Sequence, residues 1–369
     1  MEYRALGDTG YEVSPLGFGS MRLPMVDIAG HQYVDIDKAV EVIQSAFQRG
    51  VNYIDSGFMY CSQESEYAVG RALRGWRDKV IVTTKATKQR MEKPGDLRRL
   101  LEHQLVKLDI DYLDFYLFHG IGWDNFHAFD EKTGWKDDML QAKEEGLIKH
   151  IGFSFHDDPE RMIDLIDLGF FDLVTCQYNY LDRRNEESIA YAADQGLGVI
   201  VMGPVGGGRL SVIPKGGGEL FDLDEQGAAG LALRFVLANP DVAVALSGMG
   251  TVEMVEQNVA AVEKGPLDEQ EVEALSELME KNQALADLYC TGCEYCMPCP
   301  NGVNIPRNFE LYNYYRVYGF EDYAVEQYAR LVAREQDASV CIECGTCLDE
   351  CPQQIPIIEQ LKEVARLLG

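Results

Sequence analysis

The sequence predicts an α/β fold in which a (β/α)8 TIM barrel is followed by a smaller, mainly helical domain. The chain of 369 residues is long enough for one large barrel and a second small domain. Branched and aromatic runs alternate eight times with amphipathic segments over about 250 residues, as in such barrels. The first predicted strand is not followed by the G-x-G-x-x-G loop of a doubly wound sheet, which is the main alternative.

The first half of the barrel begins after a short hairpin over residues 3–16, in which Thr9 and Gly10 form the turn. Each predicted strand is a short branched or aromatic run, and each predicted helix has apolar residues at helical spacing. The strands are expected at residues 17–20, 51–54, 79–85 and 112–119. The helices are expected at residues 37–49, 67–73, 97–108 and 138–145.

The same alternation continues through the second half of the barrel. The strands are expected at residues 148–155, 173–178, 198–202 and 242–247. The helices are expected at residues 159–168, 186–195, 227–238 and 251–262. A further amphipathic helix over residues 269–285 precedes an abrupt change in composition, because eight cysteines lie between Cys290 and Cys351. We therefore place the barrel domain at residues 1–283 and the second domain at residues 284–369.

The composition limits the partners and the compartment. Asp and Glu number 61 against 33 Lys and Arg, and the formal net charge of −28 disfavours nucleic acid and anionic membranes as partners. No apolar run is long enough to cross a bilayer, and the N-terminus lacks the pattern of a signal peptide. We therefore expect a cytoplasmic protein, whose ten cysteines are not explained by disulfides.

Four ionisable residues lie at the ends of neighbouring predicted strands. Asp55 and Tyr60 follow the second strand, Lys85 ends the third and His119 ends the fourth. Because the C-terminal ends of barrel strands face the active site, these side chains are expected to meet there. Taken singly, a tyrosine in a barrel loop is usually a packing residue, and a lysine at a strand end is usually solvated. Four such residues at matched strand ends indicate a site for acid–base chemistry.

These positions belong to a wider pattern that resembles the aldo-keto reductase family. The resemblance is carried by LGDTGYEVSPLGFGSMRLP near the N-terminus, IGFS in the fifth strand, QYNY in the sixth and the loop after the eighth. It implies an oxidoreductase that reduces a small carbonyl substrate, or oxidises the alcohol, with Asp55, Tyr60, Lys85 and His119 as catalytic residues. Tyr60 would protonate the substrate oxygen, Lys85 held by Asp55 would favour the ionised phenol, and His119 would orient the oxygen.

The resemblance also implies a nicotinamide cofactor, NADH or NADPH, at the loops after strands seven and eight. The sequence departs from the family in two places. Met202 stands where an aromatic residue is common, and residues 249–254 contain no Arg or Lys for a 2′-phosphate, which weakens a preference for NADPH. The glycines at 206–208 read equally well as an ordinary turn. The implied cofactor-binding residues are Gly19, Ser20, Met21, Asp55, Ser154, Gln177, Met202, Gly203, Pro204, Ser247, Gly248, Met249, Thr251, Gln257 and Asn258.

The cysteines of the second domain form two runs, each followed by proline. The first is C-x2-C-x2-C-x2-C-P from Cys290, and the second is C-x2-C-x2-C-x3-C-P from Cys341. The second run has the spacing of bacterial ferredoxins, in which the fourth cysteine of a run serves the other cluster. By that resemblance, one [4Fe–4S] cluster has the ligands Cys290, Cys293, Cys296 and Cys351. A second cluster has the ligands Cys299, Cys341, Cys344 and Cys347. Zinc is the main alternative, because two C-x2-C pairs can form a four-thiolate site.

The sequence leaves three accounts of how the two domains work together. In the first, the two clusters exchange electrons with a ferredoxin- or flavodoxin-type carrier and connect to hydride chemistry in the barrel. In the second, the clusters are structural or sense oxygen beside an ordinary nicotinamide-dependent reductase. In the third, the chain is an electron-transfer or assembly subunit whose barrel is not catalytic. The loop over residues 121–135 is expected to shape the substrate pocket.

Overall fold

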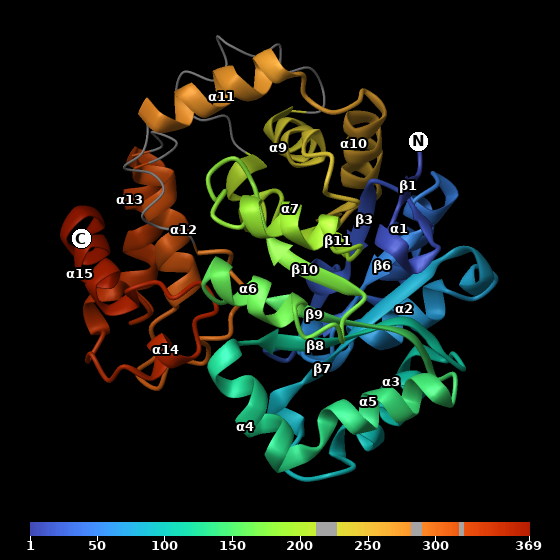
Figure 1. Ribbon diagram of the computed structural model, residues 1–369. Coiled ribbons are helices and arrows are strands. Elements are labelled where there is room, and N and C mark those ends of the chain that lie inside the picture. Colours follow the sequence, from blue (N-terminus) through green and yellow to red (C-terminus); the bar gives the residue numbers. More distant parts are fainter. Residues whose placement is uncertain (212–226, 282–289, 317–320) are drawn as a thin grey trace. The chain divides into compact units, whose positions relative to one another are not determined.

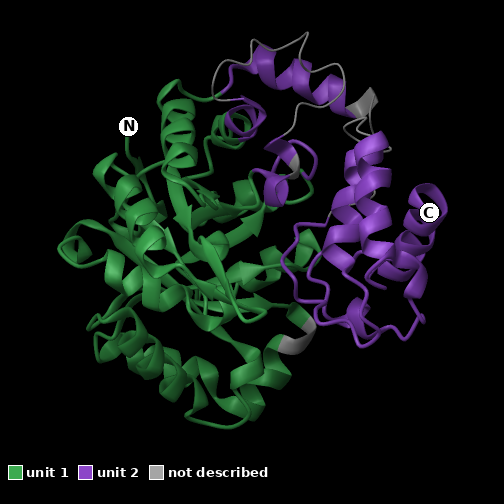
Figure 2. Ribbon diagram, turned by 180° about the vertical axis from the view of Figure 1, so that it is seen from behind, with its two compact units in different colours: residues 1–178, 183–204, 233–266 green, residues 179–182, 205–232, 267–369 purple. Residues whose placement is uncertain are grey.

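The structure is a computed structural model that describes residues 1–211, 227–281, 290–316 and 321–369. The chain divides into two compact units, drawn in different colours in Figure 2. Unit 1 contains residues 1–178, 183–204 and 233–266, and unit 2 contains residues 179–182, 205–232 and 267–369. The predicted domain boundary between residues 283 and 284 lies outside the described residues and stays a prediction.

Unit 1 is built on a closed barrel of eight parallel strands, which confirms the predicted fold class (Figure 1). The strands follow one another around the barrel in chain order, because a helical connection returns the chain after each strand. They are β3 (Leu16–Gly19), β6 (Tyr53–Asp55), β7 (Ile81–Thr87), β8 (Leu113–Ile121), β9 (Ile148–Phe155), β10 (Leu173–Gln177), β11 (Gly198–Met202) and β12 (Val244–Ser247).

Helices pack outside the strands of unit 1, each burying one apolar face (Figure 1). In the first of them Ala39, Ile43 and Phe47 recur at four-residue spacing and are buried, while the Asp35 side chain caps the N-terminus by accepting from the Lys38 amide. The helices are α1 (Ile36–Gln48), α2 (Ser65–Ala72), α3 (Asp96–Leu108), α5 (Trp135–Glu144), α6 (Pro159–Ile166), α7 (Glu186–Asp194) and α10 (Val252–Glu263). Helix α9 (Gly227–Ala238) begins in unit 2 and ends in unit 1.

The predicted N-terminal hairpin closes the bottom of the barrel. Strands β1 (Arg4–Ala5) and β2 (Glu12–Val13) pair antiparallel. Leu6 and Val13 are fully buried in one cluster with Tyr53, Phe115 and Ile200 from the barrel strands. The floor of the barrel therefore lies at the N-terminal ends of the strands, and the opposite ends carry the loops that form a site.

Two elements differ from the prediction. Residues after β3 form an additional hairpin of β4 (Met25–Ile28) and β5 (His31–Val34). The segment 121–135, expected as a loop, instead contains helix α4 (Trp123–Thr133). This expectation was wrong because Phe126 and Phe129, three residues apart, both turn toward partners on neighbouring elements, Trp135 and Phe118. Gly134 then ends the helix in the left-handed conformation, with φ of 61°.

Unit 2 is mainly helical where it is described. Its helices are α11 (Glu269–Lys281), α12 (Ile305–Arg316), α13 (Glu321–Val332), α14 (Thr346–Asp349) and α15 (Ile357–Leu368). Phe309, Tyr312, Tyr328 and Leu361 form the centre of its core, and six of the clustered cysteines pack against that core. None of the described helices has the length and apolar character that crossing a membrane would require.

Candidate active site and cysteine sites

The four predicted catalytic residues meet at the C-terminal end of the barrel. Asp55 ends β6 and Lys85 lies in β7, and their side chains form an ion pair with 2.5 Å between Oδ1 and Nζ. The same Nζ lies 4.9 Å from the centre of the Tyr60 ring. The rings of Tyr60 and His119 are 5.9 Å apart and nearly perpendicular. The phenol therefore lies between an ammonium group and an imidazole, as acid catalysis by this residue would require.

The ion pair of this site is buried. Asp55 is 3% exposed and Lys85 is 1% exposed. Burial lowers the pKa of Lys85 and raises the pKa of Asp55, and each partner opposes the shift of the other. Lys85 also donates to the Ser56 carbonyl oxygen at 2.7 Å. The second carboxylate oxygen of Asp55 is buried and has no hydrogen-bond partner among the described residues.

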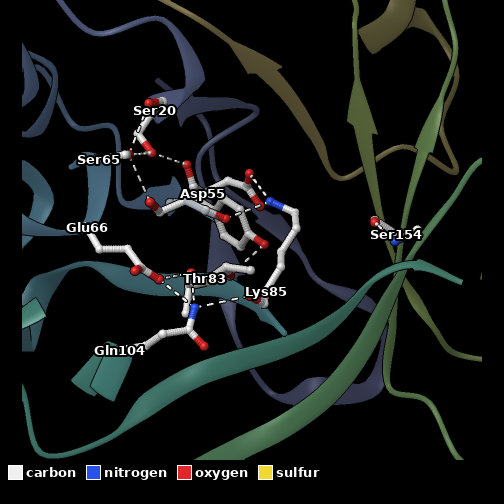
Figure 3. Close-up of polar contacts among 12 residues, drawn as sticks. Ser20, Asp55, Ser65, Glu66, Thr83, Lys85, Gln104 and Ser154 are labelled. Atoms are coloured by element: carbon white, nitrogen blue, oxygen red, sulfur yellow. Dashed lines mark hydrogen bonds and ion pairs between the residues drawn. The ribbon is translucent and has the colours of Figure 1, made fainter. Parts of the chain in front are cut away.

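A second buried network holds the strand that carries Lys85. The Glu66 carboxylate accepts from Thr84 at 2.7 Å and from Gln104 at 2.6 Å, and it pairs with Lys107 at 2.7 Å. Gln104 also donates to the carbonyl oxygen of Lys85 at 3.1 Å (Figure 3). This network fixes the backbone of β7 at Lys85 from the outer side. Sequence reasoning missed it because its members come from three separate elements.

Hydroxyl groups join the loops that follow β3 and β6. The Ser20 hydroxyl donates to the Asp55 carbonyl oxygen at 2.8 Å. The Ser65 hydroxyl lies 2.7 Å from that of Ser20 and 2.9 Å from that of Ser56 (Figure 3). Ser20 is fully buried. The Ser20 hydroxyl therefore positions Asp55. This role is independent of any contact that Ser20 makes with a cofactor.

A second histidine, which sequence reasoning missed, faces the same site. His156 directly follows strand β9, so its place after IGFSF was the available signal. Burial lowers the pKa of His156 to about 4, and Lys85 acts in the same direction. Burial also lowers the pKa of His119 well below its ordinary value, again with Lys85 contributing. Nδ1 of His156 is buried without a hydrogen-bond partner among the described residues. The site therefore holds two neutral imidazoles.

Both imidazoles are expected to stay neutral at pH values where an ordinary histidine titrates. The pKa values of both imidazoles in the folded state lie below the unfolded value of about 6.5. Above about pH 6.5, their neutral state therefore makes its full contribution to the stability of the fold. For His156 that contribution is lost as the pH falls towards about 4, and for His119 it is lost as the pH falls through that residue's own lowered pKa. Histidine-selective ¹³C NMR from about pH 8 to about pH 5.5 tests this, with signals assigned through His119→Gln and His156→Gln. A titration midpoint near 6.5 for either residue would contradict the prediction.

Three of the predicted cofactor residues lie at the ends of neighbouring strands β9, β10 and β11. Ser154, labelled in Figure 3, accepts from the Gly120 amide at 2.8 Å. Gln177 and Met202 are register partners across β10 and β11. Gly203 has φ of +65°, and a Cβ at this position would lie 2.6 Å from Nε2 of Gln177. Only glycine allows the Gln177 amide to lie against this turn, which leaves a close-fitting surface for a flat ligand.

The loop after β12 is held by side-chain caps. Ser247 accepts from the Asn258 side-chain amide at 2.9 Å, and both residues are buried. Thr251 caps helix α10 by accepting from the Met254 amide at 3.2 Å. Met249 is fully buried beneath the loop. The other predicted cofactor residues lie at strand ends, in loops or on α10: Gly19, Met21, Pro204, Gly248 and Gln257.

A base that sequence reasoning missed lies against this loop. Arg22 comes from the short helical turn after β3. A Cβ at Gly248 would meet the Cβ, Cδ and Cγ atoms of Arg22 at 3.3, 3.4 and 3.5 Å. Although residues 249–254 contain no Arg or Lys, the tertiary structure brings the side chain of Arg22 to them. The aliphatic part of the Arg22 side chain therefore packs against this loop.

The eight clustered cysteines surround two cavities within unit 2. Each cavity has three cysteines from one run and a fourth from the other run. The first contains Cys290, Cys293, Cys296 and Cys351, with Ile305, Phe309 and Ile357 among its apolar walls. The second contains Cys299, Cys341, Cys344 and Cys347, with Val303 and Leu361 among its apolar walls. The placement agrees with the exchange of fourth cysteines that the ferredoxin spacing implies.

The crowding of the thiols indicates what the cavities can hold. Burial raises the pKa of Cys296 to about 12, and the neighbouring Cys290, Cys293 and Cys351 act in the same direction. Four such thiolates cannot form together unless a bound group supplies positive charge. Among the described residues, no three His, Cys, Asp or Glu side chains converge closely enough for a single metal ion. The thiols instead surround the cavities, as the ligands of a multi-atom cluster do.

Within unit 2, the segment that follows Pro204 in the chain packs against the first cysteine run. Gly207 has φ of +69°, and a Cβ at this position would overlap the carbonyl oxygen of Thr291. The Thr291 side chain in turn hydrogen bonds to Cys293. The glycine stretch 206–208 therefore contacts the loop of the first cysteine run. Neither interpretation of these glycines from the sequence, as part of the cofactor site or as an ordinary turn, predicted this contact.

Comparison with known proteins gives matches for both parts of the chain. Residues 15–280 match the Aldo/keto reductase family, and residues 289–355 match a 4Fe-4S dicluster domain. L-galactose dehydrogenase of Arabidopsis thaliana is 30% identical over 288 residues, which is 71% of this chain and 88% of that protein. NADH-specific methylglyoxal reductase of Escherichia coli (strain K12) is 27% identical over 305 residues, 70% of this chain and 92% of that protein. The holo form of an aldo-keto reductase from Bacillus halodurans superposes with a TM-score of 0.62 at 28% identity, covering 75% of this chain and 96% of that one.

Proposed function

Since the chain belongs to the aldo/keto reductase family and carries a 4Fe-4S dicluster domain, we propose that this oxidoreductase transfers hydride between a nicotinamide cofactor and a small carbonyl or alcohol substrate. One observation carries the proposal above all. Asp55, Lys85, Tyr60 and His119 form a continuous chain of contacts at the open end of the barrel. A phenol placed between a buried ammonium and a neutral imidazole is suited to exchange a proton with a substrate oxygen.

Each of these four residues has a separate role in carbonyl reduction. A bound reduced nicotinamide supplies the hydride. Tyr60 donates its phenolic proton to the substrate oxygen as negative charge develops there. Lys85 stabilises the phenolate that remains, and Asp55 keeps the ammonium charged in a site that otherwise lowers its pKa. His119, neutral because burial lowers its pKa, donates one N–H to the same oxygen. In alcohol oxidation the Tyr60 phenolate accepts the proton.

The cofactor residues proposed for this chain fit a nicotinamide nucleotide. Asp55 contributes through the ion pair that places Lys85 at the site. Ser154 and Gln177 lie at adjacent strand ends and offer polar groups to a carboxamide. Arg22 offers positive charge to the phosphates at the loop after β12. The lack of a base within residues 249–254 therefore does not argue against nucleotide binding, and the site can take either NADH or NADPH.

We further propose that unit 2 holds two [4Fe–4S] clusters, one in each cysteine cavity. Each cluster, when bound, would exchange one electron at a time, so two clusters would together match the two electrons of one hydride, and a flavin-type group would be needed to divide the hydride's electron pair between them. We assign the clusters a redox role with an external ferredoxin- or flavodoxin-type carrier. Within unit 2, Gly207 contacts Thr291 beside the first cysteine run, and Gly207 follows Pro204 of the proposed cofactor loop by three residues.

Anaerobic titration with NADH and, separately, NADPH tests the proposed function. At least one nucleotide is expected to bind and to reduce the clusters, seen as loss of visible absorbance and growth of an EPR signal. Arg22→Ala is expected to weaken nucleotide affinity about 10-fold or more, because it removes a charged hydrogen-bond donor. Arg74→Ala is the matched control, since Arg74 is a surface residue paired with Asp109.

The outcomes separate the two parts of the proposal. If neither nucleotide binds to the wild-type protein, hydride chemistry is ruled out as the activity of the barrel. If a nucleotide binds and dithionite, but not the nucleotide, reduces the clusters, the direct connection between nucleotide and clusters is contradicted. If Arg22→Ala and Arg74→Ala weaken nucleotide affinity equally, the assignment of Arg22 to the phosphate site is contradicted.

A further inference from the structure

A second buried ion pair lies near the one that includes Lys85. Glu66 of α2 and Lys107 of α3 are 0% and 4% exposed, with 2.7 Å between Oε2 and Nζ. Gly70, one turn after Glu66, allows the two helices to approach this closely, because a Cβ there would overlap the Leu108 carbonyl oxygen. A buried ion pair often stabilises a fold no better than an apolar pair of the same volume. The contacts of this pair therefore indicate its role.

The carboxylate of the pair is linked to the backbone of Lys85 by one side chain, Gln104. The Gln104 amide nitrogen donates to Glu66 Oε1 at 2.6 Å and to the Lys85 carbonyl oxygen at 3.1 Å (Figure 3). Tyr116 donates to the Gln104 amide oxygen at 2.7 Å, which fixes the orientation of the amide. Gln104 and Tyr116 are fully buried. A displacement of the Glu66 carboxylate would therefore also displace Lys85.

The ammonium group of the pair contacts the loop that carries Tyr60. Lys107 Nζ lies 4.8 Å from the centre of the Phe58 ring, within the range of a cation–π contact. Phe58 is 6% exposed and precedes Tyr60 by two residues. The Tyr60 ring packs on the backbone of the same loop, because a Cβ at Gly57 would lie 3.1 Å from two of its ring atoms. The place of Phe58 therefore determines where the Tyr60 ring lies relative to Lys85.

We propose that the Glu66–Lys107 ion pair is a positioning element for proton transfer, because it holds both members of the contact between Lys85 and Tyr60. Neither residue of the pair touches the reacting atoms. Burial lowers the pKa of Lys85, and the negative charges of Asp55 and Glu66 oppose that shift, so Glu66 also helps to keep the ammonium charged. The inference rests on the proposed function, in which Tyr60 is the proton donor.

The double variant Glu66→Gln/Lys107→Met tests the proposal in the full-length, cluster-loaded protein. It removes the ion pair without leaving an unpaired charge in the interior. The turnover number for carbonyl reduction is expected to fall about 10-fold or more, since a displacement of about 1 Å in an active site can cost about 10²-fold. KM and nucleotide affinity are expected to change little, because the pair contacts neither ligand in the proposed mechanism.

Asp114→Asn/Arg77→Met is the matched control. This second pair has 2.9 Å between its charged groups, and Asp114 accepts from the Val82 amide of the same strand, β7, at 2.8 Å. Asp114 and Val82 lie near the N-terminal ends of their strands, away from Lys85. The control is expected to lower the melting temperature and to leave the turnover number unchanged. An equal loss of turnover in both double variants would overturn the proposal, because the Glu66–Lys107 pair would then support only the fold.

A spectroscopic signal reports on the same contact without any substrate. ¹⁹F NMR of protein labelled with 3-fluorotyrosine gives a signal for Tyr60, assigned through Tyr60→Phe. This signal is expected to shift in Glu66→Gln/Lys107→Met and to stay in place in Asp114→Asn/Arg77→Met. An unshifted signal in the first variant would overturn the proposal. Because the measurement needs no turnover, a wild-type protein without carbonyl reduction would contradict the proposed function and leave this test intact.

Phe58→Leu tests the contact with the Tyr60 loop while every buried charge stays in place. It removes the ring that faces Lys107 and is expected to lower the turnover number and to shift the Tyr60 signal. In the Glu66→Gln/Lys107→Met background the same substitution is expected to add little further loss, because the contact is already absent. Losses that multiply in full would show that Phe58 and the ion pair act independently, which would contradict the proposal.

Discussion

Replacing Tyr60 with phenylalanine is expected to lower the turnover number for carbonyl reduction by about 10²- to 10⁴-fold, the usual contribution of a positioned general acid. The substitution removes only the hydroxyl group, so the ring keeps its contacts with Lys85 and His119. Nucleotide affinity is expected to change little, because none of the proposed cofactor contacts uses the Tyr60 hydroxyl. Steady-state kinetics with a panel of aldehydes and ketones, together with a nucleotide titration, measures both quantities.

Tyr67→Phe is the matched control for this prediction. Tyr67 lies in helix α2, close to Tyr60 in the chain, and is 47% exposed. Removing the Tyr67 hydroxyl is expected to leave the turnover number unchanged. Full activity of Tyr60→Phe would contradict the assignment of Tyr60 as the proton donor. An equal loss of activity in both variants would point to a general disturbance of the fold.

Pairs of cysteine substitutions are expected to show how the two clusters share their ligands. Cys296 and Cys351 line one cavity, whereas Cys299 lines the other. Either Cys296→Ala or Cys351→Ala is expected to remove one cluster, which lowers the iron content from about eight to about four atoms per chain. The double variant Cys296→Ala/Cys351→Ala is expected to lose no more iron than either single variant. Cys296→Ala/Cys299→Ala is expected to lose both clusters.

The comparison of the two double variants separates the assignments. If each run of cysteines held its own cluster, Cys296→Ala/Cys299→Ala would lose only one cluster and Cys296→Ala/Cys351→Ala would lose both. Cys61→Ser is the matched control, because Cys61 lies in unit 1 outside both runs. Analysis of iron, acid-labile sulfide and zinc in anaerobically prepared protein, with EPR, provides the measurement. Zinc without sulfide in the wild-type protein would contradict the clusters themselves.

The barrel was predictable because its signals are local. A strand of branched residues, a helix with one apolar face and a glycine cap each occupy fewer than about 15 residues. Strands 148–155 and 198–202 and helix 227–238 have the predicted bounds. The four predicted catalytic residues meet because strand ends in a barrel face the same side. The short hairpin at residues 25–34 was missed because its exposed strands carry little periodicity.

The parts of the site that sequence reasoning missed involve residues far apart in the chain. Arg22 reaches the loop at Gly248 only because β3 and β12 are neighbours in the closed barrel. Glu66 supports Lys85 through Gln104, a contact that joins two helices and a strand. The Trp135 ring packs against Phe118 of β8, with 4.6 Å between the ring centres. None of these pairs has a signature in its own segment.

The sequence by itself determined the barrel, the four residues at its strand ends and the two cysteine runs, because periodicity and spacing act over short stretches of chain. Only the tertiary structure decided which distant side chains share a site. It placed Cys351 with the first run, and it placed the half-buried His156 beside His119 as a second imidazole with a lowered pKa. The physical reason is that desolvation and packing depend on neighbours supplied by other elements, and local sequence does not specify those neighbours.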